Sequence, residues 1–412
     1  MSDSPTSPPR LDRRLGTGDA VVIGLGSMVG AGVFAAFAPA AEAAGAALLV
    51  GLGIAAGVAY CNATASAQLA AQYPTSGGTY VYGRERLGDW WGFLAGWGFV
   101  VGKTASCAAM ALTFAAYAAP DGWQRPVAVA AVVALTAVNY RGITRTARLT
   151  RVLVTVVLLA IAVVVAAGVA GGEADLGGVT VLDPEGGWYG VLQSAGLLFF
   201  AFAGYARVAT LGEEVRDPAR IIPRAIQLAL ALTVAIYAVV AVTVLSVLGP
   251  DRVADSSAPL AAVVAAGGWD WAGPVVRIGA AAASLGALLA LIAGVGRTTL
   301  AMARQDDLPR WLAAVHPRHR VPHHAELALA VAVCALVLTV DLRGAIGFSS
   351  FGVLLYYLVA NLAAFTQDDE RRRFPRVLQV LGAVACAVLV ATLPASAVVA
   401  GLVVLAVGVA YR

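Results

Sequence analysis

The sequence predicts an all-α membrane protein, and three observations lead to this fold class. Hydrophobic residues make up 60% of the 412 residues and charged residues only 13%, which is more apolar surface than one soluble core can bury. The apolar residues fall into stretches of about 20, the length that crosses a bilayer as a helix. Arginines gather between alternate stretches, as they do in cytoplasmic loops. We therefore expect a polytopic protein with twelve transmembrane helices.

The expected helices follow one another with short polar, glycine-containing or proline-containing connections. The first six are residues 19–39, 45–70, 85–118, 126–139, 151–170 and 188–211. The second six are residues 222–248, 271–303, 324–340, 345–365, 377–392 and 395–411. Both termini are expected in the cytoplasm, because only four arginines then lie outside: Arg125, Arg252, Arg277 and Arg343. The net charge of +4 therefore indicates membrane orientation rather than a nucleic-acid surface.

The first span is expected to be a broken helix. Its stretch GLGSMVGAGVF, residues 24–34, contains four glycines, and each costs about 1 kcal/mol relative to alanine in a helix interior. A break inside the membrane leaves backbone N–H and C=O groups free, which is tolerated where they line a cavity or bind a ligand. Free N–H groups suit a carboxylate and free carbonyls suit an ammonium. The stretch therefore predicts a site for a zwitterion.

A second interruption is expected in the sixth span. The run FFAFAGYA, residues 199–206, contains Gly204 and is followed by polar and charged residues. Spans one and six occupy equivalent places in two five-helix halves. Paired interruptions at corresponding positions are typical of inverted-repeat transporters that bind their substrate at the membrane midplane.

Four stretches carry a resemblance to a known family: GLGSMVGAGVF from Gly24, YPTSGGTYVY from Tyr73, FFAFAGYARVATLGEEVRDPARIIPRAI from Phe199, and AMARQDDLP from Ala301. With these stretches the chain resembles the amino acid/polyamine/organocation (APC) permease superfamily. The resemblance implies the leucine-transporter fold, a 5+5 inverted repeat with discontinuous helices 1 and 6. The expected domains are a disordered cytosolic tail (1–16), a first repeat (17–170), a second repeat (187–366) and a C-terminal helical hairpin (374–412).

The resemblance also implies the substrate site. Backbone amides around Ser27 and at Gly30, Ala31 and Gly32 would receive a carboxylate. Carbonyl groups near Ile23 and Met28 and in the second break would receive the amino group, with Phe200 or Phe202 as a wall. The residues of the second break are Phe200, Ala201, Phe202, Ala203 and Gly204.

The chain departs from the family pattern at positions that matter for coupling. Many relatives have serine where this chain has Ala31, and an acidic residue where it has Ala206 and Arg207. Residues 155–159, TVVLL, lack the lysine that takes the place of a sodium ion in some relatives.

Two residues are candidates for coupling transport to an ion. Lys103, the only lysine, falls midway along the third span, and an ionisable group at that depth is by default a functional one. We interpret it as the carrier or gate of a coupling proton; a purely structural contact is the alternative. Ser284 is the only central hydroxyl of the eighth span and is the candidate for sodium coupling. Measuring uptake with sodium replaced by choline would separate the two.

These observations predict a secondary active transporter of the cytoplasmic membrane that works by alternating access, with proton-coupled symport of a small neutral amino acid. An amino acid or polyamine exchanger and a sodium-coupled symporter remain alternatives, as do a channel and an amino acid sensor. We expect no enzymatic activity, because the spans contain no paired carboxylates or nucleophile and base. No cofactor or metal site is expected; the histidines of HPRHRVPHH, residues 316–324, are interpreted as part of a cationic loop. The protein is expected to be a monomer or a homodimer.

Overall fold

The computed structural model describes residues 15–73, 77–142, 147–171, 186–209, 211 and 214–412. Within these ranges the chain is helical apart from connections and one extended contact, between Leu15 and Val215. Leu15 belongs to the segment expected as a disordered tail, but its amide donates to the carbonyl of Glu214. The remainder of that tail, residues 1–14, lies outside the described residues.

The helices of the first half follow the expected spans closely. They are α1 (Thr17–Met28), α2 (Gly32–Ala35), α3 (Phe37–Ala44), α4 (Leu48–Gln72), α5 (Gly78–Leu87), α6 (Asp89–Ala118), α7 (Gln124–Tyr140) and α8 (Ala147–Ala170). Helix α5 was not expected as a separate element, because it lies mostly between the expected spans 45–70 and 85–118.

The second half contains the corresponding helices and two additional short elements. They are α9 (Gly187–Phe202), the 3₁₀ turn η2 (Ala203–Tyr205), α10 (Ala206–Ala209), α11 (Pro218–Asp255), α12 (Pro259–Ala266), α13 (Gly273–Arg304), the 3₁₀ turn η4 (Arg310–Ala313), α14 (His323–Thr339), α15 (Leu342–Phe365), α16 (Arg376–Thr392) and α17 (Ala395–Tyr411). Helix α12 and the turn η4 were not anticipated.

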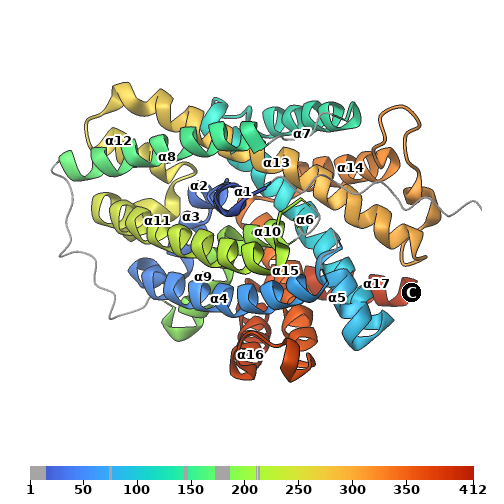
Figure 1. Cartoon of the computed structure of the whole chain (residues 1–412). Coiled ribbons are helices and arrows are strands. Elements are labelled where there is room, and N and C mark those ends of the chain that lie inside the picture. The colour runs from blue at the N-terminus through green and yellow to red at the C-terminus, as the bar shows by residue number, and fades with distance from the viewer. Residues whose placement is uncertain (1–14, 74–76, 143–146, 172–185, 210, 212–213) are drawn as a thin grey trace, which may run out of the picture.

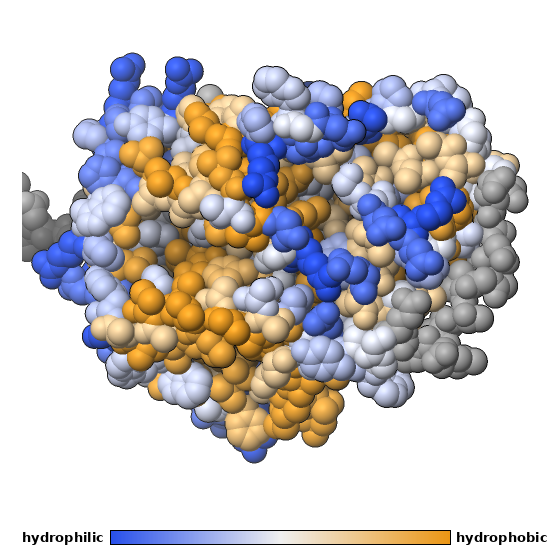
Figure 2. All heavy atoms as spheres, turned by 180° about the vertical axis from the view of Figure 1, so that it is seen from behind, coloured by the Kyte–Doolittle hydropathy of each residue, from blue (hydrophilic) through white to orange (hydrophobic). Residues whose placement is uncertain are grey.

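Eight helical segments of the described chain are long and apolar enough to cross a bilayer, or nine if α16 and α17, which meet at a bend of 112°, form one span. Broad apolar areas cover the face shown in Figure 2, where hydrophilic side chains gather in bands and at the edges. Soluble monomers rarely expose apolar surface on this scale, so the chain is a multi-pass membrane protein. The count of twelve spans and the inverted repeat remain predictions.

The break expected in the first span lies between α1 and α2. Helix α1 ends at Met28, α2 begins at Gly32, and a further change of direction at Ala36 leads into α3. These segments lie at the centre of the helix bundle in Figure 1. The glycine-rich stretch therefore interrupts a helix that is surrounded by others.

The interruption expected in the sixth span is a 3₁₀ turn, whereas that of the first is non-helical. Helix α9 passes into the single 3₁₀ turn η2 and then into α10. The turn contains Gly204, as expected, but it tightens the helix rather than opening a gap.

Helix packing divides the centre of the molecule into two groups. Helix α10 packs on α1, α4 and α11, whereas α14 packs on α6, α7 and α13. We call α1, α10 and α11 the first wall, and α7, α13 and α14 the second wall. The two walls meet at the break in α1, where Gly30 lies against Ala287 of α13.

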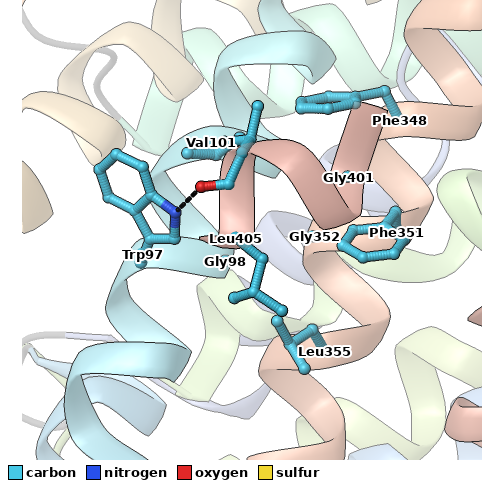
Figure 3. Close-up of a pocket in the computed structure, with 10 residues that line it drawn as sticks. Trp97, Gly98, Val101, Phe348, Phe351, Gly352, Leu355, Gly401 and Leu405 are labelled. Atoms are coloured by element: carbon cyan, nitrogen blue, oxygen red, sulfur yellow. Dashed lines mark hydrogen bonds between the residues drawn. The ribbon is translucent and has the colours of Figure 1, made fainter. Parts of the chain in front are cut away.

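The last helix, α17, docks on α6 and α15 through small residues. The indole nitrogen of Trp97 donates a 3.0 Å hydrogen bond to the carbonyl of Val404 (Figure 3). A Cβ on Gly408 would lie 2.5 Å from that nitrogen, and a Cβ on Gly401 would lie 2.5 Å from the ring of Phe351. The small apolar hollow drawn in Figure 3 is part of this packing and has no polar side chain that could orient a solute except Trp97.

Candidate functional site

The two interruptions lie side by side in direct backbone contact. A Cβ built on Gly204 would lie 2.1 Å from the carbonyl oxygen of Ser27, and one built on Gly32 would lie 2.7 Å from the Cα of Ala201. Only glycine permits two backbones to approach this closely. The glycines that predicted two separate breaks therefore also join them into one site.

Tyrosine hydroxyls form hydrogen bonds with the carbonyl groups of this site. The hydroxyl of Tyr237, on α11, lies 2.6 Å from the carbonyl oxygen of Met28 and 3.0 Å from that of Ala201. Its single proton can be donated to one of them at a time or shared between them. Tyr357, on α15, donates a 3.4 Å hydrogen bond to the carbonyl of Ala203. The acceptors expected to bind an amino group thus already have donors in this conformation.

The predicted wall residues are buried around the same point. Phe202 packs against the ring of Tyr237, with centroids 5.0 Å apart, and is fully buried. Phe200 is buried in the same apolar cluster as Ala31 and Ala287. The residues expected to form the substrate site are therefore brought together, and their side chains are apolar and closely packed.

A cavity of about 120 Å³ reaches this site from one side. Ile23 and Ser27 line it, and the hydroxyl of Ser27 donates a 2.7 Å hydrogen bond to the carbonyl of Ile23. The lining does not include Gly30, Ala31, Gly32 or the residues of the second break. Of the predicted site residues, Ile23 and Ser27 alone face this cavity.

The cavity lies between the two walls and is lined by charged side chains from both. Arg207 of α10 and Glu214 belong to the side of the first wall, and Arg297 of α13 belongs to the second wall. Arg207 is close enough to both of the others for their charges to interact. Asn139, at the end of α7, also lines the cavity and donates a hydrogen bond to the carbonyl of Leu289. The cavity is therefore polar and contains both signs of charge.

Comparison with known proteins gives the site its context. A family described as amino acid permeases matches residues 15–411, nearly the whole chain. The chain belongs to the amino acid permease family. This membership agrees with the resemblance to the APC superfamily, and it makes the site at the two interruptions the candidate substrate site of a permease.

Relatives of this permease include bacterial and plant proteins. An uncharacterized transporter of Mycobacterium tuberculosis (strain H37Rv) is 62% identical over 403 residues, which cover 98% of this chain and 91% of the relative. The branched-chain amino acid permease BcaP of Bacillus subtilis is 25% identical over 90% of this chain and 84% of its own. Cationic amino acid transporter 7 of Arabidopsis thaliana, chloroplastic, is 30% identical over 84% of this chain and 64% of its own. These relatives are named as transporters and permeases.

The two coupling candidates of the permease occupy different environments. Lys103 is buried in α6 and is not among the residues that line the cavity. Ser284 is fully buried on α13, and its hydroxyl has no hydrogen-bond partner among the described residues. It follows Ala283, whose carbonyl oxygen lies 3.8 Å from the Cβ position of Gly30. Ser284 therefore follows a residue that lies next to the break in space, and Lys103 lies on α6.

A polar cluster joins the loop helix α5 to the segment after α13. Asp307 is buried; its carboxylate accepts a 2.6 Å hydrogen bond from the hydroxyl of Tyr80 and forms a 2.8 Å ion pair with Arg84. Arg412 also pairs with Asp307 and lies over the rings of Trp90 and Phe93. The cluster shows that the stretch after Tyr73, one of the four that carry the family resemblance, is fixed to two distant parts of the chain.

Sequence reasoning missed Tyr237 and Arg297, which the structure brings to the site, and Glu326, which packs against Gly296 next to Arg297. Tyr237 stands alone as a hydroxyl-bearing aromatic in the apolar run ALTVAIYAVV, and this isolation was an available signal. Arg297 and Glu326 each lie near the end of an expected span, and nothing in the sequence around them indicates a site residue. Their proximity depends on how α13 and α14 pack, which a single sequence does not contain.

Proposed function

We propose that this permease is a secondary active transporter that carries a small neutral amino acid across the cytoplasmic membrane by alternating access, in symport with a proton. The observation that carries the proposal is the backbone contact between the two interrupted helices, reached from one side by a polar cavity. Broken helices that meet at mid-membrane are the recurring form of substrate sites in such transporters.

The proposed substrate site comprises the backbone of Ile23, Ser27, Met28, Gly30, Ala31 and Gly32, and of Phe200, Ala201, Phe202, Ala203 and Gly204. An incoming ammonium group would replace the hydroxyl of Tyr237 as the partner of the carbonyl of Met28, because a charged donor forms the stronger hydrogen bond. The side chains around these carbonyls are alanine and phenylalanine, which favours a small apolar side chain on the substrate. Arg207 and Arg297 in the cavity disfavour a cationic amino acid or a polyamine.

The experiment that tests this proposal is uptake into proteoliposomes that contain the full chain. We expect saturable, stereoselective uptake of small neutral amino acids when the external medium is the more acidic. A screen of all amino acids by thermal shift of the detergent-solubilised protein would first identify the ligand. Binding without uptake would favour a sensor, and current that does not saturate would favour a channel.

Proton coupling is tested at Lys103. Its burial within α6 supports a role for its charge, since an ammonium at this depth is costly unless it is used or paired. We expect Lys103→Gln to abolish acceleration of uptake by a proton gradient while leaving exchange of labelled for unlabelled substrate. Uptake that still follows the gradient in this variant would remove Lys103 from the mechanism.

Sodium coupling remains the second candidate, and the unpartnered hydroxyl of Ser284 favours it. A hydroxyl on α13 and carbonyl groups of a broken α1 are ligands that suit sodium. Replacement of sodium by choline at fixed pH would slow uptake only if sodium is coupled, and Ser284→Ala would then have the same effect. Uptake that needs neither gradient and requires substrate on the opposite side would indicate an exchanger.

The proposed organisation places both termini in the cytoplasm, with five-helix repeats at 17–170 and 187–366 and a peripheral pair of helices at 374–412. Labelling of single cysteines introduced in the loops, with a reagent that does not cross the membrane, tests this topology. The permease is proposed to act as a monomer or homodimer without a cofactor and without enzymatic activity.

A further inference from the structure

Glu326 is a buried carboxylate that the proposed transport site does not use. It lies in the first turn of α14, with 2% of its surface exposed. Its side chain packs against the backbone of α13, where its Cγ would lie 3.0 Å from a Cβ on Gly296. Its Oε2 atom has no hydrogen-bond partner in the part of the chain that the structure describes. Burial without a donor is costly for an ionised carboxylate, so this packing suits the protonated form.

The helices around Glu326 bring several charged and titratable groups near it. Helix α14 packs on α6, α7, α13 and η4. The other charged or titratable residues on these elements and on α14 itself are Asp89, Lys103, Cys107, Tyr117, Arg125, Tyr140, Arg277, Arg297, Arg304, Arg310, His323, His324 and Cys334. Arg310 forms an ion pair with Asp306 on the surface, and the ring of Tyr140 lies edge-on or tilted against the rings of His316, His319 and His323. Arg297 is the group whose charge acts on Glu326.

Arg297 connects this buried carboxylate to the cavity. It follows Gly296 on α13 and lines the cavity, whereas Glu326 lies behind it in the second wall. Glu214 lines the same cavity from the side of the first wall. Arg297 therefore has one carboxylate behind it and a second, Glu214, across the cavity, where the charge of Arg207 also acts on Glu214.

We propose that Glu326 is a proton-binding residue whose charge state positions Arg297. When Glu326 is ionised, it attracts Arg297 and holds it against the second wall, which leaves the cavity open. When Glu326 takes up a proton, Arg297 loses this partner and pairs with Glu214 instead. The pair joins the two walls and closes the cavity. The proton comes from the water on the cavity side and returns to it, so no other reactant is needed.

This inference rests on the proposed transport function, because it assigns pH dependence to the opening of a transport pathway. Its test is exchange of labelled for unlabelled amino acid in proteoliposomes with the same pH on both sides, which removes the proton gradient as a driving force. The pH is varied from about 5 to about 8, the range in which a buried carboxylate titrates. We expect wild-type exchange to fall several-fold on acidification as Glu326 becomes protonated.

Three variants separate the positioning role from a structural one. Glu326→Gln should give slow exchange that no longer depends on pH, because glutamine resembles the protonated form. Glu326→Asp should keep a pH-dependent step. Arg297→Gln should also abolish the step, since no cation remains to be positioned. Glu370→Gln, an exposed carboxylate in the loop after α15, is the matched control and should retain the wild-type profile.

A wild-type pH profile in Glu326→Gln or in Arg297→Gln would overturn the proposal. If Glu326→Gln does not fold, Arg297→Gln decides alone, because Arg297 is exposed and its replacement removes no buried side chain. Absence of exchange by the wild type at every pH would instead refute the proposed transport function, so the two failures are distinguishable.

Discussion

The hydroxyl oxygen of Tyr237 lies 2.6 Å from the carbonyl oxygen of Met28, at the point where α1 ends. The same hydroxyl lies 3.0 Å from the carbonyl of Ala201, near the end of α9. One side chain on α11 therefore satisfies acceptors of both interrupted helices. It also fills the place that an amino group of the substrate is proposed to take.

Tyr237→Phe is expected to lower the melting temperature of the protein without substrate. The increase in melting temperature that substrate gives should change less. The variant removes the hydroxyl proton that the carbonyl groups of Met28 and Ala201 share, at a cost of about 1–3 kcal/mol. Thermal unfolding with and without the amino acid found by screening measures both effects. Tyr60→Phe is the control, because Tyr60 is exposed. An unchanged melting temperature for Tyr237→Phe would contradict a role for the hydroxyl at the break.

Gly204→Ala is expected to abolish substrate binding. The new methyl group would lie 2.1 Å from the carbonyl oxygen of Ser27, and backbone cannot move aside as a flexible side chain can. Separating the two interruptions to make room costs about 3 kcal/mol, against a gain in helix propensity of at most about 1 kcal/mol.

Gly53→Ala provides the matched control for this prediction. Gly53 lies in α4 and a Cβ there would meet no atom within 4 Å, so we expect binding and stability to be retained or slightly improved. Thermal shift with the identified amino acid distinguishes the two variants. Normal binding by Gly204→Ala would show that the contact between the interruptions is not part of the site.

Helix positions were predictable because a bilayer imposes a length and an apolar composition on each span. The expected range 345–365 corresponds to α15 (Leu342–Phe365), and 45–70 to α4 (Leu48–Gln72). Helix α5 was not predicted because it is short and polar, so the length and apolar composition that a bilayer imposes do not apply to it. The break near Gly30 was predicted because several glycines in one span lower its helix propensity. The interruption at Gly204 was predicted from a single glycine, and there the structure has a 3₁₀ turn.

The contacts that build the site were not predictable, because they join distant parts of the chain. Nothing local to Tyr237 indicates that its hydroxyl meets Met28, which lies 209 residues away. Arg297 and Glu326 are also ordinary residues at the ends of spans until α13 and α14 are packed together. Sequence patterns thus located the backbone of the candidate site, and the polar side chains around it required the tertiary structure.

Gly408→Ala is expected to loosen the docking of α17. The added methyl group would collide with the indole of Trp97, which donates to the carbonyl of Val404. Displacement of this ring would cost about 1–3 kcal/mol and would lower the thermal stability. Val407→Ala, at an exposed neighbouring position, should have little effect. Equal stability of the two variants would contradict the docking role of Gly408.

Asp307→Asn is expected to destabilise the cluster that fixes α5. The carboxylate is buried and pairs with Arg84 and Arg412, so its replacement by an amide removes the buried partner of both cations. Removing one member of a buried ion pair costs about 3 kcal/mol.

The neighbouring Asp306→Asn is the control. Asp306 is exposed, pairs with exposed Arg310, and has a backbone φ of 60° that asparagine adopts readily. We expect a lower melting temperature for Asp307→Asn alone, together with faster proteolysis in the loop that contains α5. Equal behaviour of the two variants would mean that Arg84 retains sufficient compensation from Asp89, its second partner at 2.8 Å.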